Sequence, residues 1–475
     1  MKRSYGVRLF GVVVLIMAFL VSADVVSARS FADDFFGDDS SEKVIKKDKD
    51  KDKDKDKDKD KDKDKDKKKD KDKDKKKDKS KDDDDVDALV GKYSDKGCKS
   101  LTETNPPFEA GLGGYAVFRA PTLAISKKGT VLAFCEGRVD GHQDEGDMDI
   151  VLRRSKDNGK TWEKMQVLEN DGKNPCKLAC PVVLDSGRIL VLWAWNKSIK
   201  DESERKNLPY PSRPVFMTYS DDDGKTWSKS RDITSMVYGK GWGWSGLGPC
   251  HGIVKRRDPN KGRIVFAARH NPGGDSKGRS HVIYSDDEGK TWNIGGSALQ
   301  RSSESTVVEL SNGEIMLNSR NQDDKSHYRL VSLSRDGGKT FYTSYEDKAL
   351  VEARGCQGSL LFHSINKKTG KANIIFSNPR NPEWRANGCL QLSEDDGKTW
   401  AKRRRYSGKP LKFSGYSDIA LINGNDIAVL FEKGGEPELD EKGNYAKDAK
   451  GDRYDKVGFK IIPFSALEEP DKGKK

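Results

Sequence analysis

An eight-residue phrase recurs five times in this chain, and each copy stands between segments rich in strand-forming residues. Every copy fits the pattern Ser-x-Asp-x-Gly-x-Thr-aromatic, and the copies occupy residues 155–162, 220–227, 285–292, 334–341 and 393–400. The Asp side chain can hydrogen-bond its own backbone and the Gly accepts a positive φ, so each copy predicts a tight turn. We expect the closing aromatic ring to pack back over that turn.

The spacing of the copies predicts how the chain is built. They begin 65, 65, 49 and 59 residues apart, about what a four-stranded sheet and its loops require, and such repeats are typical of a β-propeller. Short apolar segments between them predict strands, for example residues 130–134, 189–193, 263–267 and 373–376. The sequence therefore predicts an all-β domain over residues 86–475, a six-bladed β-propeller. One blade would lack the phrase, or would join strands from both ends of the domain.

The N-terminus predicts export. Lys2, Arg3 and Arg8 precede an apolar run over residues 9–21, and small residues follow it. This pattern indicates a secretory signal peptide over residues 1–23, with cleavage after residue 28 as an alternative. The run is short for a membrane span, although an uncleaved signal anchor stays open. We expect a protein that is secreted, at the cell surface or periplasmic, with no transmembrane span after signal cleavage.

A low-complexity tract explains most of what is unusual in the composition. After a short acidic-aromatic segment over residues 24–43, residues 44–85 form a Lys/Asp linker with almost nothing apolar to bury, so we expect it to be disordered. The linker either tethers the domain to a surface or is an inert spacer. The net charge of +12 would suggest a polyanion partner, but outside the tract it is spread thinly. We therefore expect no nucleic-acid partner.

Cysteines and histidines give no sign of a metal site. The chain has 7 Cys and 6 His, with no second Cys or His pair at metal-site spacing after Cys176 and Cys180. We expect no catalytic metal and no cofactor. An exported chain permits disulfides, and the odd count leaves at least one cysteine free or paired between chains.

Three arginines lie near the ends of expected strands: Arg119, Arg320 and Arg380. Taken singly, each would be a surface ion-pair residue. Converging on the propeller axis, the three would grip one carboxylate through paired N–H donors.

Together with the repeats, these contexts resemble the sialidase (neuraminidase) family over residues 114–432. Phe118-Arg119-Ala120-Pro121 is similar to that family's Phe/Tyr-Arg-Ile-Pro signature, with Ala in place of Ile. The resemblance implies that Arg119, Arg320 and Arg380 bind the substrate carboxylate. It also implies that Asp144 is the acid/base, Tyr416 the nucleophile, Glu304 its partner, and that Glu432 steadies the first arginine. Asp147 and Asp149 are alternatives to Asp144.

A tyrosine nucleophile makes physical sense for such a substrate. Sialic acid carries a carboxylate on its anomeric carbon, which would repel an attacking Asp or Glu, and sialidases are an exception to the usual carboxylate pair. A neutral phenol with a pKa near 10 is a weak nucleophile unless a base takes its proton, which Glu304 would do. Asp144 would protonate the leaving oxygen and later deprotonate water.

Other residues keep two interpretations. Arg138 either lines the pocket or is a structural ion-pair partner, and Trp193 and Trp195 either contact an N-acetyl group or pack in a blade. His251 is expected to be structural or to bind substrate. Asn196-Lys197-Ser198 is the one glycosylation sequon.

The resemblance thus implies an exo-α-sialidase acting on sialylated glycoproteins, glycolipids or oligosaccharides with retention of configuration. The alternatives are a trans-sialidase or anhydro-forming sialidase, with Trp384 or Trp242 as an acceptor platform, a non-catalytic sialic-acid-binding propeller, and a structural or sorting propeller that shares only the repeats.

Overall fold

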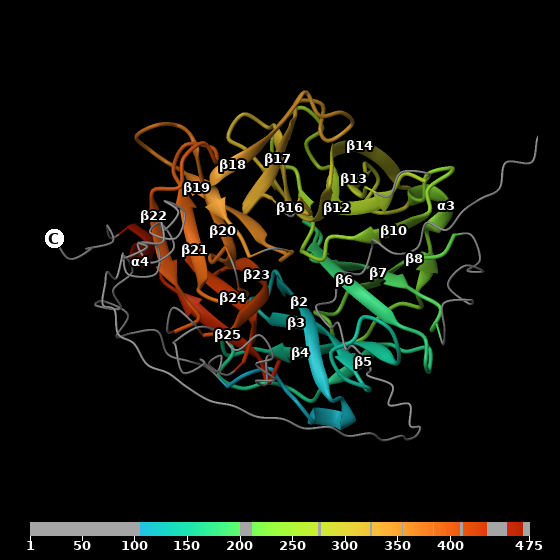
Figure 1. Ribbon diagram of the computed structural model, residues 1–475. Coiled ribbons are helices and arrows are strands. Elements are labelled where there is room, and N and C mark those ends of the chain that lie inside the picture. Colours follow the sequence, from blue (N-terminus) through green and yellow to red (C-terminus); the bar gives the residue numbers. More distant parts are fainter. Residues whose placement is uncertain are drawn as a thin grey trace, which may run out of the picture. The chain divides into compact units, whose positions relative to one another are not determined.

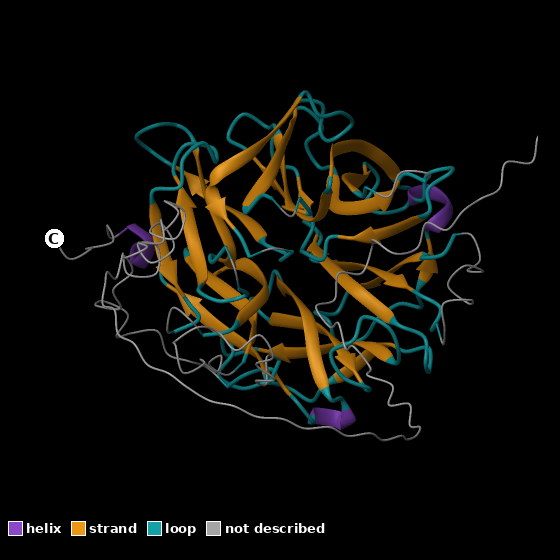
Figure 2. Ribbon diagram, in the orientation of Figure 1, coloured by secondary structure: helices purple, strands orange, loops and turns teal. Residues whose placement is uncertain are grey.

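Six antiparallel sheets contain all of the strands among the described residues (Figures 1 and 2). The computed structural model describes residues 105–199, 211–273, 277–323, 325–353, 355–382, 384–408, 412–434 and 454–468. The predicted signal peptide, acidic-aromatic segment and Lys/Asp linker lie outside these ranges.

Each sheet is formed by consecutive strands of the chain, except for one strand of the last sheet. From the innermost strand outward, the first two sheets are β2 (Val117–Ile125), β3 (Val131–Arg138), β4 (Met148–Ser155) and β5 (Gln166–Glu169), and β6 (Cys176–Val183), β7 (Ile189–Trp195), β8 (Val215–Ser220) and β9 (Arg231–Asp232). The third sheet begins with β10 (Trp244–Leu247) and β11 (Ile253–Val254) and continues with β12 (Ile264–Asn271), β13 (Arg279–Ser285) and β14 (Asn293–Gln300), and the fourth is β15 (Ser302–Glu309), β16 (Ile315–Asn321), β17 (Tyr328–Ser334) and β18 (Thr343–Val351). The fifth sheet is β19 (Ser359–Ile365), β20 (Ala372–Pro379), β21 (Gly388–Ser393) and β22 (Lys402–Arg405), and the sixth is β23 (Ser414–Ile422), β24 (Asp426–Lys433), β25 (Lys456–Ile462) and β1 (Phe108–Glu109).

The innermost strands form a closed ring. Each contacts the innermost strand of the next sheet, and β23 of the last sheet contacts β2 of the first. Figure 1 shows the sheets following one another around a common centre. The predicted all-β, six-bladed β-propeller is confirmed, and the four strand segments singled out in the sequence lie at β3, β7, β12 and β20.

The sixth blade closes the ring in the way the repeat count suggested. Its outermost strand, β1, comes from the start of the domain and pairs antiparallel with β25, with Phe108 opposite Val457. The same blade contains no copy of the repeated phrase, so both predicted features of the exceptional blade occur together.

Each repeat forms the connection from the third to the fourth strand of its blade, and its polar atoms are used in the same way every time. In the first copy, Gly159 N donates to Ser155 Oγ at 2.8 Å, and Asp157 accepts from the backbone and hydroxyl of Thr161 at 2.9 and 2.6 Å. The Ser-to-Gly distance is 2.8 Å in the other four copies as well. The predicted turn is therefore a rigid, internally satisfied unit.

The prediction that the aromatic ring packs over its own turn is incomplete, because the ring also contacts the neighbouring blade. Trp162 lies edge-on to Phe459 of the sixth blade, with ring centroids 5.4 Å apart, and Trp227 lies edge-on to Phe134 of the first blade. The turns pack closely on the neighbouring blade: a Cβ on Gly159 would lie 2.4 Å from the Phe459 ring. The repeats thus join adjacent blades.

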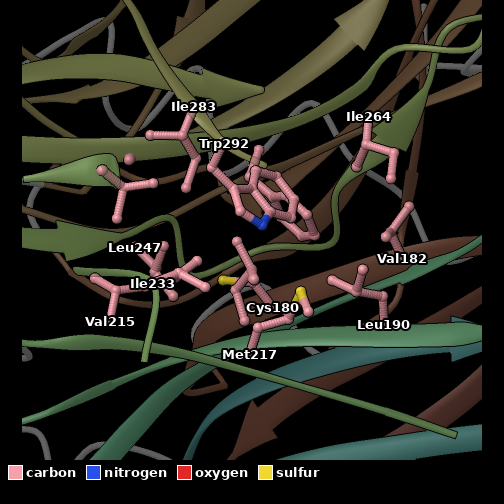
Figure 3. Close-up of a cluster of buried hydrophobic side chains, with 14 of the residues drawn as sticks. Cys180, Val182, Leu190, Val215, Met217, Ile233, Leu247, Ile264, Ile283 and Trp292 are labelled. Atoms are coloured by element: carbon pink, nitrogen blue, oxygen red, sulfur yellow. The ribbon is translucent and has the colours of Figure 1, made fainter. Parts of the chain in front are cut away.

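The core lies between the blades. Figure 3 shows one such cluster, in which Leu190 and Met217 of the second blade face Ile264, Ile283 and Trp292 of the third. Burying each large aliphatic side chain contributes about 1.5–3 kcal/mol. Among the described residues the helices are single turns, η1 (Leu112–Gly114), α3 (Thr234–Val237) and α4 (Ser465–Glu468). No helix in the described part of the chain is long and apolar enough to cross a membrane.

Candidate active site

The strand order places most of the predicted site residues at one face of the propeller. Arg119, Glu304 and Tyr416 lie near the starts of the innermost strands β2, β15 and β23, and Arg320 lies near the end of the second strand β16. Because adjacent strands are antiparallel, starts of innermost strands and ends of second strands meet at the same face. The repeats join the other ends of the third strands, so they lie at the opposite face.

Tyr416 and Glu304 form a hydrogen-bonded pair although 112 positions separate them in the sequence. The Tyr416 hydroxyl lies 2.6 Å from both carboxylate oxygens of Glu304, and both side chains are buried. Burial and the Glu304 charge raise the pKa of Tyr416 well above its usual value. Burial opposes the Glu304 charge, but Arg320 and Arg269 outweigh it and lower the pKa of Glu304. The pair is therefore a neutral phenol held against an ionised carboxylate.

Two of the three predicted arginines lie beside this pair. Arg320 Nη1 donates to Glu304 Oε2 at 2.9 Å and to the Tyr416 hydroxyl at 3.3 Å. The guanidinium carbon of Arg119 lies 5.7 Å from the centre of the Tyr416 ring. The Nε of Arg320 is buried and has no hydrogen-bond acceptor within the described ranges, as expected for a donor whose acceptor is an anionic ligand.

A third arginine beside Tyr416 is Arg385, which was not predicted from the sequence; Arg380 was predicted instead. The guanidinium carbon of Arg385 lies 5.3 Å from the centre of the Tyr416 ring, and its Nη2 donates to Gly355 O at 2.9 Å. Arg380 comes directly after β20, where its backbone N–H and C=O both pair with Asn387. The β20–β21 connection continues beyond it, so the cation beside Tyr416 comes from the loop and not from the strand end.

Glu432 joins the first and last blades behind the site. Its Oε1 accepts from the backbone of Ala120 at 3.0 Å and lies 3.4 Å from Arg119 Nε, while its Oε2 accepts from the backbone of Tyr416 at 2.9 Å. Glu432 is fully buried. A Cβ on Gly415 would lie 2.1 Å from Glu432 Oε2, so this close approach requires glycine. The predicted contact of Glu432 with the first arginine is present in the structure, with Tyr416 attached to the same carboxylate.

Asp144 stands across the site on the β3–β4 connection, held by cations. Its Oδ1 lies 2.9 Å from Arg138 Nη1 and 3.7 Å from Arg119 Nη1, yet its side chain is 60% exposed and so open to a ligand. Desolvation favours the neutral acid, but Arg138, Arg119 and Lys177 together lower the pKa of Asp144. Asp147, one alternative, has its pKa raised by burial and by its neighbours Asp149 and Asp140. Asp149, the other, accepts hydrogen bonds from Tyr115 and Asn170. Of these three aspartates, Asp144 is therefore the one that pairs with Arg138 and Arg119.

Arg138 is a buried ion-pair residue that supports the Asp144 loop. Besides Asp144, it donates to the backbone carbonyls of His142 and Gln143 at 2.5 and 2.6 Å and pairs with Glu136. The ion pairing of Arg138 is therefore structural, and the segment that it supports is the loop that carries the predicted acid, Asp144.

Several site residues were missed in the sequence. Arg269, near the end of β12, lies 3.4 Å from Glu304, and Arg213 and Arg269 both face the Trp244 ring. Lys177 Nζ donates to Asp144 O at 3.0 Å, and burial and Arg213 lower the pKa of Lys177 to about 8. Arg320 was selected because it lies near the end of an expected strand, and the same criterion would also have selected Arg269. Nothing in the local sequence distinguishes the other residues from surface cations.

The remaining candidates make structural contacts. Trp193 is buried in a core cluster of the first and second blades, and the Trp195 indole donates to Asp171, which favours packing over ligand contact. His251 lies 2.7 Å from the buried carboxylate of Asp418. All six cysteines within the described ranges are free, and no group of three or more His, Cys, Asp or Glu residues there is arranged to hold a metal ion.

Comparison with known proteins gives a consistent result. The sequence model of the BNR repeat-like domain family matches residues 129–429. The chain is 32% identical to the sialidase of Paraclostridium sordellii over 351 residues, which cover 69% of this chain and 84% of that protein. It is 31% identical to the sialidase of Bacteroides fragilis over 348 residues, covering 68% of this chain but only 61% of that longer protein. In structure it is similar to the Hadza microbial sialidase Hz136, with a TM-score of 0.63, 26% identity, and coverage of 76% and 68% of the two chains.

Proposed function

The chain belongs to the BNR-repeat sialidase family, and on that premise we propose that it is an exo-α-sialidase, a glycoside hydrolase that removes terminal sialic acid from glycoconjugates with retention of configuration. The observation that carries this proposal is the buried Tyr416–Glu304 pair at 2.6 Å beneath three arginines. That arrangement suits a substrate with a carboxylate at the reacting carbon, because the cations attract the substrate anion and the neutral phenol does not repel it.

Substrate binding is assigned to Arg119, Arg320 and Arg385. The guanidinium carbons of Arg119 and Arg385 lie 5.7 and 5.3 Å from the centre of the Tyr416 ring, and Arg320 donates to the Tyr416 hydroxyl. The Nε of Arg320 has no acceptor within the described ranges and is available to a ligand. A carboxylate held among them would place the anomeric carbon above the Tyr416 hydroxyl. Hydrogen bonds to a charged group contribute about 1.5–3 kcal/mol each, so this cluster would supply much of the binding energy.

In the first chemical step, the Tyr416 oxygen attacks the anomeric carbon as its proton passes to Glu304. The raised pKa of Tyr416 means that no phenolate exists beforehand, so the phenol is deprotonated only as the new C–O bond forms. The bond to the leaving oxygen breaks, and Asp144 gives that oxygen a proton. The product is a tyrosyl-sialyl intermediate and a free alcohol.

In the second step, water attacks the same carbon from the face that the alcohol has left. Asp144 takes the proton of the water, and the departing Tyr416 oxygen recovers its proton from Glu304. Two displacements retain the configuration, and all three catalytic groups end in their starting protonation states.

Asp144 must be protonated to act as an acid, although in the free protein its pKa is lowered. A bound substrate would favour the protonation of Asp144. Its carboxylate would compete with Asp144 for Arg119, which lies 3.7 Å from Asp144 Oδ1, and would add a like charge nearby. Both effects raise the pKa of Asp144 and so favour its acid form when an anionic substrate binds.

Export and surface tethering complete the proposal. The N-terminal basic and apolar segments support secretion or display at the cell surface or in the periplasm, and the Lys/Asp segment would act as the tether or spacer. Substrates would then be sialylated glycoproteins, glycolipids or oligosaccharides outside the cytoplasm.

The test is release of the aryl alcohol from an aryl α-sialoside by the purified protein and by Tyr416→Phe. We expect wild-type turnover that falls at least about a thousandfold in the variant. NMR of the first product distinguishes α-sialic acid from an anhydro sugar, and an added acceptor sugar reveals transfer. Absence of wild-type turnover, with sialic acid still bound, would replace hydrolysis by a binding function.

A further inference from the structure

Tyr454 is a half-buried tyrosine just before β25 that contacts two of the three arginines assigned to substrate binding. Its ring lies under the guanidinium of Arg119, with 4.2 Å between the guanidinium carbon and the ring centre. Its hydroxyl accepts a hydrogen bond of 3.1 Å from Arg385 Nη1. One side chain from the sixth blade therefore touches two arginines that come from the first and fifth blades.

The two contacts limit how these arginines can move. A cation over an aromatic face is attracted to the ring, and the attraction grows as water is excluded. The phenol hydroxyl occupies one N–H of Arg385, and Gly355 O occupies another at 2.9 Å. Because a guanidinium is planar and has five N–H groups in a fixed fork, fixing two of them orients the other three. Arg119 is fixed from one side by the ring and near its Nε by Glu432.

Tyr454 also reaches the loop that carries Asp144. Its ring lies nearly parallel to that of His142, with centroids 6.2 Å apart and an interplanar angle of 20°. The His142 carbonyl accepts from Arg138 at 2.5 Å and from Arg119 at 3.3 Å. Tyr454 also meets Phe413 edge-on, with ring centroids 5.2 Å apart. The tyrosine is thus held in place independently of the arginines, and it lies between the arginine cluster and the acid loop.

We propose that Tyr454 is a positioning residue that sets Arg119 and Arg385 for the carboxylate of the substrate and ties their position to the Asp144 loop. This inference rests on the proposed sialidase function. Tyr454 need not touch the reacting atoms. By holding the two arginines, Tyr454 keeps their N–H donors directed at the carboxylate position before the substrate binds, so little conformational entropy is lost on binding.

Two substitutions separate the parts of this role. Tyr454→Phe removes only the hydrogen bond to Arg385 and keeps the ring, so we expect KM for an aryl α-sialoside to rise about threefold to tenfold while kcat stays within about twofold. Tyr454→Leu removes the ring as well, so we expect KM to rise about thirtyfold or more, and the acid limb of the kcat/KM profile to shift as the Asp144 loop loosens. Tyr342→Phe is the matched control, since this exposed tyrosine bonds Glu314 at a distant repeat.

Binding to a carboxylate-bearing ligand distinguishes positioning from general loosening. The probe is a 2,3-unsaturated sialic acid analogue, measured by calorimetry beside its carboxamide. We expect Tyr454→Phe to weaken binding of the carboxylate form but not of the carboxamide. Equal weakening of both, or KM within twofold of wild type for the folded Tyr454→Leu protein, would overturn the inference. Failure of the proposed function would look different, because the wild type would then show no turnover.

Discussion

The assignment of the third arginine can be tested by a matched pair of substitutions, Arg385→Lys and Arg380→Lys. Both keep a positive charge, so they differ only in where the planar fork is lost. Arg385 stands 5.3 Å from the Tyr416 ring centre, whereas the backbone of Arg380 closes the β20–β21 connection on Asn387. If Arg385 grips the substrate, only Arg385→Lys should weaken substrate binding.

The magnitude follows from the bonds that lysine cannot replace. A guanidinium donates two parallel hydrogen bonds to a carboxylate, and an ammonium acts as a point charge. Loss of one charged hydrogen bond costs about 1.5–3 kcal/mol, and 1.4 kcal/mol is tenfold in affinity, so KM should rise about 10- to 100-fold. Lysine also loses either the Gly355 or the Tyr454 contact, so a small decrease in the thermal midpoint is expected.

The assay is steady-state hydrolysis of an aryl α-sialoside, with thermal melting as the control for folding. We expect KM of Arg380→Lys to stay within about twofold of wild type. The assignment would be refuted if Arg380→Lys raised KM tenfold while Arg385→Lys left it unchanged in a folded protein. A decrease in kcat alone for Arg385→Lys would instead mean that this arginine acts on the transition state and not on substrate binding.

Three further outcomes follow from the structure. Asp144→Ala should lower kcat on a natural sialyl-oligosaccharide by about 10²–10⁴ but spare an aryl substrate whose leaving group needs no proton, and equal losses on both would reject the acid role. Gly415→Ala should displace Glu432, since the added Cβ would lie 2.1 Å from its Oε2, and should reduce both activity and unfolding free energy, the latter by about 1–3 kcal/mol; Gly243→Ala, whose added methyl meets nothing closer than 3.4 Å, is the control, and equal melting temperatures for the two variants would contradict this. Burial and Arg279 lower the pKa of His270 to about 4, and burial and His270 lower that of His281, so these two sites bind fewer protons in the folded protein than in the unfolded chain below about pH 6.5. The thermal midpoint should therefore decrease as pH falls from about 6.5 to about 4, less steeply in His281→Phe, and identical pH profiles would remove this pair from the cause.

The repeats made the fold predictable, because their meaning is local. The side chains of Ser155, Asp157 and Thr161 satisfy one another within a single turn, so the turn is present in the sequence itself. Five such turns at similar spacing leave few architectures other than a propeller. The partner of each aromatic ring was not predictable, because it depends on how neighbouring blades approach one another.

The site was predictable only where a residue stands in a recognisable context on a strand. Tyr416 and Glu304 lie on innermost strands and Arg320 lies on a second strand, and the position of each strand in its blade follows from the repeat order. Arg385 lies in the β20–β21 loop, and strand periodicity does not indicate which residue of a loop reaches the site. Tyr454 and Lys177 offer no sequence signal, because their importance arises from atoms more than 30 positions away.

The contacts of Glu432 indicate that the site forms only when the propeller closes. One buried carboxylate on β24 accepts from the backbones of Ala120 on β2 and Tyr416 on β23, and Ala120 lies 312 positions from Glu432. The sheet that carries Glu432 is completed by β1, the first of the described strands, so strands from both ends of the described propeller must be paired before this carboxylate is fixed. A partly closed ring would leave Glu432 buried without its donors or would keep it in water, and in either case Arg119 and Tyr416 would lose their common support. We therefore expect removal of residues 105–110 to abolish activity more completely than it reduces the content of β structure, measured by circular dichroism. Parallel loss of both would mean that the blades fold only as one unit.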